Sequence, residues 1–172
     1  MHGERQLYLK PDTALLVNRK PFFLPHFTED VLAHPCIVAR IDRMGRCIAA
    51  KFASRYYNET ALAINFSAAA LEEAKSVDEI TKSIAFDNSF SVGVFSTDNK
   101  EAAKWWQNGI THSFTSMLTK IDEAIALASS YITLRTGDMV AVDLLADPIS
   151  AKREDVFSAT LEDNEILYCK IK

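Results

Sequence analysis

The side chains that could do acid–base, nucleophilic or metal chemistry are few and widely spaced. The four histidines, His2, His26, His34 and His112, have no acidic partner at ligand spacing. The three cysteines, Cys36, Cys47 and Cys169, form no CxxC pattern. His26 and His34 each neighbour a proline, which favours loop-packing roles for both. No Gly-rich phosphate loop, GxSxG elbow or HExxH motif is present. The residue types alone therefore predict almost no catalytic signal.

The composition narrows the class of protein. The chain has 172 residues, 48% of them hydrophobic, and a net charge of −4. This length fits one domain over residues 1–172. The mild acidic balance argues against a nucleic-acid or anionic-membrane partner, which needs a clustered basic face. The apolar run at 61–71 falls well short of the ~20 residues that span a bilayer. An odd cysteine count favours a reducing compartment, so we expect a cytoplasmic protein.

The elements that must position these residues follow from periodicity and turn signals. Short apolar runs between Pro, Asn, Asp and Gly predict many strands. We expect them at 14–17 and 21–24 (a hairpin), 36–41, 47–50, 60–64, 90–95, 139–142, and 156–161 with 166–171 (a second hairpin). Helical spacing predicts a helix at 121–131, and Ser67 as an N-cap predicts a short one at 68–75. The expected fold class is α+β, mostly β.

Four segments together resemble the fumarylacetoacetate hydrolase family in its small bacterial form. They are LYLKPDTALLVNRKPFFLP (7–25), the stretch 34–73 that includes KFASRYYNE, IAFDNSFSVG (84–93), and the stretch 116–140 that includes YITLRTGD. The type that they resemble is the 2-hydroxyhepta-2,4-diene-1,7-dioate isomerase or acylpyruvate hydrolase. The resemblance implies a mixed-sheet β-roll with a few short helices that commonly dimerises. It also implies an enzyme that uses Mg²⁺, Mn²⁺ or Ca²⁺ on 2-oxo and 2,4-diketo acids, where the cation stabilises a developing enolate.

The chain departs from the family at the metal-ligand positions. A Glu-x-Glu pair is expected just after the segment that corresponds to His34 and Pro35, and this chain has Cys36 and Val38 there. Asn65 stands where the resemblance implies the third carboxylate, an aspartate. A thiol, a valine and an amide do not offset the dehydration of a hard cation. We therefore expect no metal cofactor.

The other chemical positions differ as well. The catalytic lysine that the resemblance implies corresponds to Ile84, with Lys82 two residues upstream. The N-terminal family segment that carries a histidine has no counterpart before the LYLKP motif, so we expect that family segment to be missing.

These departures predict a pseudo-enzyme without catalytic activity. We expect it to act as a structural or regulatory partner, in a homodimer or in a heterodimer with an active paralogue.

Two alternatives stay open at the level of sequence. The first is an active hydrolase, isomerase or decarboxylase whose metal or base comes from Lys82, Asp87, Glu72 or Glu73. The second is a binding module that keeps the pocket for a small carboxylic acid. Arg40, Arg55 and Tyr56 are the candidate ligands for such an acid, and with Lys82 and Asp87 they form the candidate residual pocket.

Overall fold

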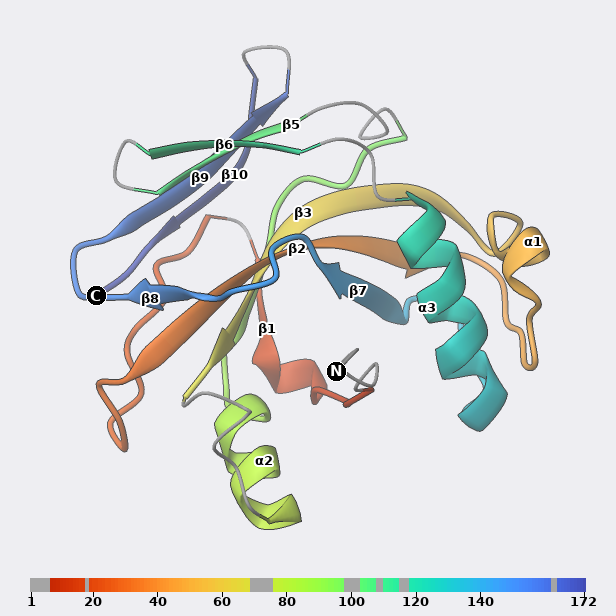
Figure 1. The fold of residues 1–172 in the computed structure, drawn as a ribbon, viewed down its shortest axis with the longest axis horizontal. Helices are drawn as coiled ribbons and strands as arrows, with labels where there is room; N and C mark the ends of the chain where they lie inside the picture. The colour runs from red at the N-terminus through yellow and green to blue at the C-terminus, as the bar shows by residue number, and fades with distance from the viewer. Residues whose placement is uncertain are drawn as a thin grey trace.

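Two β-sheets and a few helices make up the part of the chain that the structure, a computed structural model, describes (Figure 1). The described residues are 7–17, 19–68, 76–97, 103–107, 110–114, 118–161 and 164–172. The larger sheet has the order β1–β4–β3–β2–β7, and β8 also pairs with β2. Its strands are β1 (Leu15–Leu16), β2 (Val31–Ile41), β3 (Tyr57–Ser67), β4 (Phe90–Val92), β7 (Met139–Asp143) and β8 (Ile149–Ala151).

The smaller sheet has the order β10–β9–β5–β6 and is antiparallel throughout. Its strands are β5 (Ala103–Gln107), β6 (Ile110–Phe114), β9 (Val156–Leu161) and β10 (Asn164–Lys170). In the larger sheet β1 is parallel to β4 and the other pairs are antiparallel, so that sheet is mixed. The expected class, α+β and mostly β with a mixed sheet, is confirmed.

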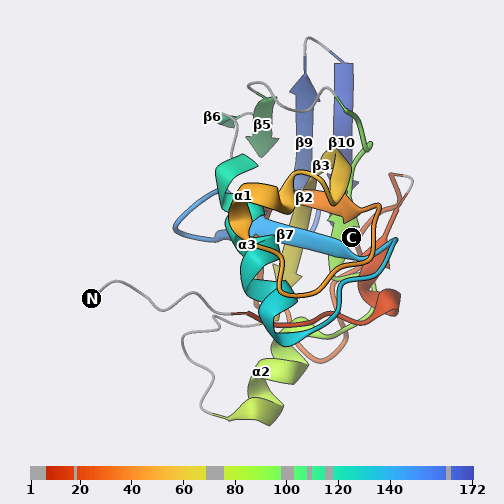
Figure 2. The same cartoon turned by 90° about the vertical axis from the view of Figure 1, so that its right-hand side faces the viewer.

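The helices are α1 (Ala50–Ala53), α2 (Val77–Ile84) and α3 (Leu118–Tyr131), with a 3₁₀ turn at Asp12–Ala14. α2 begins where Ser76 and Glu79 form a reciprocal capping box, which satisfies two backbone donors at the helix start. α3 buries Ile121, Ile125 and Ala128, the face that the apolar spacing predicts. It packs against α1 and β7 (Figure 2). No helix in the described part of the chain is long and apolar enough to cross a membrane.

The long pair β2–β3 forms the centre of the larger sheet. The two strands stay in register from Leu32 opposite Ser67 to Arg40 opposite Glu59. A proline in a central strand removes a ladder donor, yet Pro35 lies within β2. It is tolerated because it falls between the stretch of β2 that pairs with β8 and the stretch that pairs with β7.

Alternation along β2 and β3 gives the sheet two different faces. One face carries Ile37, Ile64 and Phe66 and packs against α3 and the smaller sheet in the main core. The opposite face carries a smaller apolar cluster formed by Cys36, Val38, Ala61, Ala63, Phe90 and Val92. The residues that the resemblance singled out on these two strands lie on this second face, which we call the site face.

A short crossing segment joins the two sheets after β4. Gly93 N donates to Leu62 O (2.9 Å), and Val94 N donates to Ile166 O (2.7 Å). A Cβ atom on Gly93 would lie 2.2 Å from Ile166 O and 3.0 Å from Leu62 O. Only glycine fits this close approach of three backbone segments. The strand expected at 90–95 ends at Val92 because the chain leaves the sheet here.

The hairpin expected at 14–17 and 21–24 is wrong. β1 pairs in parallel with β4, and Phe22 instead forms a bridge with Ile171. Phe22 is fully buried, and its ring stacks on Phe66 with the ring centroids 4.1 Å apart. Burial of this ring in the distant core outweighs the local turn signal. The strand expected at 47–50 is also wrong, since this segment leads into α1.

The remaining elements follow the sequence more closely. Strands form at 60–64 and 139–142, the helix at 121–131 is confirmed, and the C-terminal hairpin is confirmed as β9 and β10. The strand expected at 36–41 is longer, since β2 begins at Val31. The short helix expected at 68–75 lies, apart from its first residue, outside the described residues.

Replacement of Gly93 by alanine tests the close approach between the sheets. We expect Gly93→Ala to lower the free energy of unfolding by at least about 3 kcal/mol, because backbone carbonyls cannot move aside as side chains can. Gly137→Ala is the matched control: Gly137 has a φ of 96° and open space around its Cβ position. Alanine at position 137 adds only backbone strain, which should lower the free energy of unfolding by about 1 kcal/mol. Urea unfolding of both variants checks this, and equal losses would contradict it.

Candidate functional site

The site face brings two of the three metal-ligand positions named from the resemblance into one corner of the sheet. Cys36 pairs with Ala63 and His34 pairs with Asn65, so Cys36 and Asn65 are diagonal neighbours across β2 and β3. Val38 lies one step further along the same face, opposite Ala61. All three side chains are buried, with Cys36 and Val38 fully so and Asn65 4% exposed.

The Cys36 thiol stays protonated in this setting. Burial raises the pKa of Cys36 well above its usual range, and the nearby Asp143 carboxylate raises it further. Lys10 and a backbone hydrogen bond at Asn65 oppose these effects less strongly. A thiol is a weak ligand and a weak nucleophile until it loses its proton. Cys36 is therefore a small buried hydrophobe here, as the sequence predicts.

Asn65 is the least satisfied polar group on the site face. Its Nδ2 donates to the Tyr8 hydroxyl at 2.6 Å. Its Oδ1 is buried and accepts no hydrogen bond from the described residues. Burial raises the pKa of Tyr8, and the Asp143 charge adds to this effect, so the phenol is neutral. A buried amide oxygen without a donor is costly, and in native proteins it indicates a water or a ligand.

Lys10 ties the N-terminal segment to the site face. Its Nζ donates to Ile84 O (2.6 Å), to Ser89 Oγ (2.7 Å), and to two further carbonyl oxygens, Phe66 O (3.2 Å) and Ser89 O (3.3 Å). Burial lowers the pKa of Lys10 to about 7. The four oxygen acceptors favour the charged ammonium, which has three hydrogens to donate where a neutral amine has two. The side chain therefore acts as a fixed cation that holds the N-terminal segment to three other chain segments, at Phe66, Ile84 and Ser89.

His34 lies within β2, not in a loop as its neighbouring proline suggested. Its Nε2 is 3.0 Å from Ser67 Oγ, and its Nδ1 is 3.9 Å from Asp143 Oδ2. Burial lowers the pKa of His34, the Asp143 charge opposes this, and the Lys10 charge adds to it. The imidazole is therefore neutral at pH 7.

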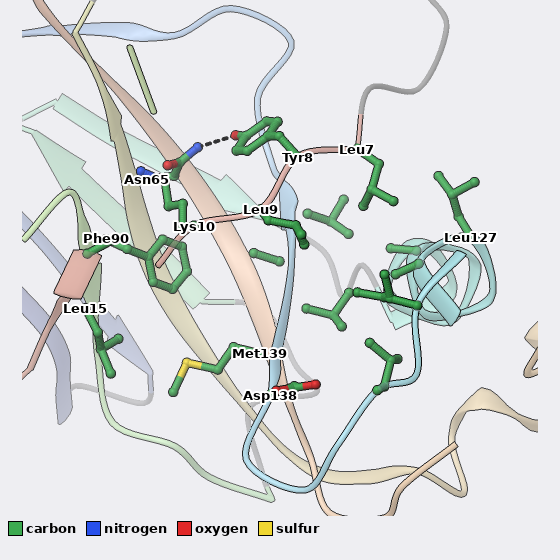
Figure 3. A pocket seen from close by; sticks show the side chains of 18 of the residues that line it. Leu7, Tyr8, Leu9, Lys10, Leu15, Asn65, Phe90, Leu127, Asp138 and Met139 are labelled. Carbon is green, nitrogen blue, oxygen red and sulfur yellow. Dashed lines mark hydrogen bonds between the residues drawn. The ribbon is translucent and has the colours of Figure 1, made fainter. Parts of the chain in front are cut away.

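A cavity opens beside these groups, between the N-terminal segment, β7 and α3 (Figure 3). Its volume is about 1110 Å³. Tyr8 and Asn65 point toward each other at one side of it, and Leu127 of α3 lies at the other (Figure 3). The lining is mostly apolar, and the polar groups on it include Tyr8, Lys10, Asn65, Asp12, Lys120, Glu123, Asp138 and Asp143. This cavity is the candidate functional site.

Comparison of the sequence with protein-family models and with curated proteins finds no match. Solved structures do match over nearly the whole chain. A fumarylacetoacetate hydrolase family protein from Yersinia pestis is 20% identical, with a TM-score of 0.81 over 96% of this chain and 84% of its own. The 2-hydroxyhepta-2,4-diene-1,7-dioate isomerase from Mycobacterium marinum is 21% identical, with a TM-score of 0.82 over 99% of this chain and 69% of its own. This chain has the fumarylacetoacetate hydrolase fold.

A third match with this fold carries ligands. Fumarylpyruvate hydrolase from Pseudomonas aeruginosa, in complex with Mn²⁺ and pyruvate, is 16% identical with a TM-score of 0.78 over 95% of this chain and 77% of its own. The resemblance at the level of fold is thereby confirmed. At these identities the likeness extends to the fold, so the chemistry must be judged from the residues of this chain.

The three positions named from the resemblance do not suit a divalent cation such as the Mn²⁺ of the Pseudomonas protein. The three positions offer a protonated thiol, an isopropyl group and an amide, and the Lys10 ammonium lies close to Cys36. Hard cations need several anionic oxygens to replace their water shell. Among the described residues, no group of three or more His, Cys, Asp or Glu side chains could hold a metal ion.

The other residues singled out from the sequence are not gathered at this cavity. Arg40 pairs with Glu59 and stacks on Phe95, and Arg55 stacks on Phe52, close to α1. Tyr56 packs beside Gly45.

The remaining predicted residues lie around α2. Lys82 is exposed and pairs with Asp78, and Asp87 is exposed in the turn before β4. Ile84 is buried and contributes only its carbonyl oxygen, to Lys10. Glu72 and Glu73 lie outside the described residues. Among the described residues, none of those named for an active or acid-binding alternative lines the cavity.

Sequence reasoning missed three residues that line the cavity, Tyr8, Lys10 and Asp143, and it gave His34, which lies beside Asp143, only a loop-packing role. Tyr8 and Lys10 fall within the LYLKP motif that carried part of the resemblance, so their positions gave a signal but no role. Asp143 gave none, because β7 meets β2 only through the sheet topology.

Replacement of Lys10 tests its role as a fixed cation. We expect Lys10→Met to lower the free energy of unfolding by about 2 kcal/mol, because it removes a charged donor that four oxygens share. Ser89 O and Ile84 O keep a second donor, from Phe66 N and Ser89 Oγ. Lys20→Met is the control, since Lys20 is an exposed lysine. Chemical denaturation of both variants gives the comparison. A loss no larger than that of Lys20→Met would show that the ammonium is not needed.

The lowered pKa of His34 predicts a pH dependence of stability. As the pH falls below about 6.5, the unfolded chain takes up a proton at this residue before the folded chain does, so folding is weakened. We expect stability to decline as the pH falls below about 6.5, and His34→Gln to make that decline shallower. His26→Gln, at an exposed histidine, serves as control. Thermal unfolding across this range measures the slopes, and identical slopes for wild type and His34→Gln would contradict the assignment.

Proposed function

We propose that this protein is a non-catalytic form of the fumarylacetoacetate hydrolase fold that works without a divalent metal, as a structural or regulatory partner. One observation carries the proposal: the three positions where the resemblance implies carboxylates hold buried neutral groups, Cys36, Val38 and Asn65. Two of these, Cys36 and Val38, belong to the apolar cluster of the site face.

The electrostatic balance supports this proposal. Three carboxylates would bring negative charge that attracts a divalent cation and repays its dehydration. Here the same corner has no such charge, and the Lys10 ammonium adds positive charge next to Cys36. The Asp143 carboxylate does act on Cys36 and raises the pKa of its thiol, but the Asp143 side chain is 46% exposed. One half-exposed carboxylate does not replace three buried ones.

The active-enzyme alternative gains no support from the described residues. Lys82 is 72% exposed at its side chain and held by Asp78, and Asp87 is exposed, so neither faces the cavity. A binding module for a carboxylic acid would need a free cation at the cavity. Arg40 is occupied by Glu59, and Lys10 donates to four oxygens. The other lysine of the lining, Lys120, is exposed on α3.

Partnership is the remaining part of the proposal. A non-catalytic copy that keeps this fold can act by stabilising or regulating a catalytic relative, in a homodimer or with an active paralogue. Light scattering on the purified chain, alone and mixed with such a paralogue, measures both assemblies. A chain that stays monomeric in both would contradict a role as dimer partner.

Metal binding and turnover test the loss of chemistry. We expect Mn²⁺ or Mg²⁺ at millimolar concentration to leave the melting temperature of the EDTA-treated protein unchanged, and acylpyruvates to be stable in its presence. The Asn65→Asp variant, and Cys36→Glu/Val38→Glu/Asn65→Asp, restore carboxylates at the same positions. We expect Mn²⁺ to raise the melting temperature of these variants above their own metal-free values, because bound ligand stabilises the folded state. Metal-dependent cleavage by the unaltered chain would overturn the proposal.

A further inference from the structure

We propose that the cavity binds a small organic amine, whose nitrogen donates to Asn65 and is attracted by the charge of Asp143, and whose apolar body lies against the lining of the site face. The inference deepens the proposed function and rests on it in one respect: the site works without a metal ion. It assigns to this cavity a ligand class opposite in charge to the acids that the resemblance implies.

The first step is the unsatisfied acceptor. Asn65 Oδ1 is buried in the cavity wall and receives no hydrogen bond from the described residues. The neighbouring donors do not reach it: the Tyr8 oxygen accepts from Asn65 Nδ2, so its own hydrogen points away from Asn65, and Lys10 Nζ faces four other oxygens. An acceptor left over in this way needs an N–H or O–H group from a bound molecule.

The second step is the charge of the lining. Four carboxylates line the cavity, from Asp12, Asp138, Asp143 and Glu123, against two lysines, Lys10 and Lys120. Lys10 is held in its cage of oxygens, so it cannot turn toward a ligand anion. Lys120 is exposed on α3, and the lining as a whole still carries net negative charge, which repels an organic acid and attracts an ammonium group.

The third step is the position of Asp143. This carboxylate lies at the end of β7, opposite Cys36, and β2 separates it from Asn65 of β3 on the same face. Partial burial raises the pKa of Asp143 and the neighbouring His34 lowers it, and with 46% of the side chain exposed we treat the group as ionised at neutral pH. Tyr8 is affected by both groups, through its hydrogen bond to Asn65 and the charge of Asp143. An amine that donates to Asn65 beside Tyr8 would therefore also be attracted by the Asp143 charge.

The fourth step is the apolar part of the wall. Leu9, Leu15, Phe90 and Met139 line the cavity (Figure 3), and Phe90 of β4 pairs with Asn65 of β3. Small-molecule sites usually combine a mostly apolar wall with a few polar groups that orient the head group of the ligand. An aromatic or alkyl body attached to the amine would bury against these side chains.

Three probes of nearly equal shape and different charge test the inference: phenethylamine, 2-phenylethanol and 3-phenylpropanoate. Each is titrated into isotope-labelled protein, and the side-chain amide signals of Asn65 are followed by NMR. We expect phenethylamine to shift these signals and to bind at least about tenfold more tightly than 3-phenylpropanoate. A tenfold difference is the smallest contribution expected from a hydrogen bond that involves a charged group. Tighter binding of the acid, or no shift with any probe at millimolar concentration, would overturn the inference.

Matched variants locate the binding. Asp143→Asn should weaken the binding of phenethylamine by about tenfold and leave the binding of 2-phenylethanol unchanged, because the substitution removes the charge of the side chain but keeps its shape. Asn65→Leu should weaken the binding of both probes. Asp147→Asn changes an exposed aspartate outside the cavity and should weaken the binding of neither. Asp143 is half exposed, so this variant tests the inference even where Asn65→Leu fails to fold. Amine binding that is unaffected by Asp143→Asn would overturn the assignment.

A Mn²⁺ titration of the same sample separates the two proposals. Binding of Mn²⁺ at Asn65 would contradict the proposed function, whatever the probes do. Absence of both Mn²⁺ and amine binding would contradict the amine inference and leave the proposed function standing.

Discussion

The cage of oxygens around Lys10 is the interaction on which the candidate site depends. One ammonium group joins the N-terminal segment to the end of α2, to β3 and to the start of β4. Because it fixes Lys10, it also fixes Tyr8 two residues earlier, and Tyr8 in turn holds the Asn65 amide. Burying a charged amine is costly, and several carbonyl oxygens offset that cost only when all of them are in place. The corner of the cavity is therefore assembled together with the fold.

Strand register decides which side chains share the site face. β2 and β3 are paired over nearly their whole length, so a shift of one residue in either strand would put Asn65 on the opposite face from Cys36 and Val38. Such a shift is prevented by the main core, where Ile37, Ile64 and Phe66 pack on the opposite side. The fold can therefore keep its geometry while the chemistry of the site face changes, because stability is supplied mainly by the other face.

The properties of the cavity come from a balance of few charges in a partly dry environment. Cys36 and His34 are neutral because burial disfavours their charged forms, and Lys10 remains charged because oxygens surround it. What remains is an amide oxygen without a donor and an acidic lining. These are features of a site that accepts hydrogen-bond donors, and they differ from those of a site built around a divalent cation.

The sequence by itself determined the fold class, the long C-terminal helix, the C-terminal hairpin and the resemblance, because these rest on local periodicity and ordered motifs. It also named Cys36, Val38 and Asn65 as positions without carboxylates. Only the tertiary structure decided that Phe22 leaves the expected hairpin to stack on Phe66, since burial in a distant core outweighs a short turn. The same holds for the group of Tyr8, Lys10, His34 and Asp143. These residues come from the N-terminal segment, β2 and β7, and they meet only because β7 pairs beside β2 and the carbonyl oxygens near β3 and β4 capture the Lys10 ammonium.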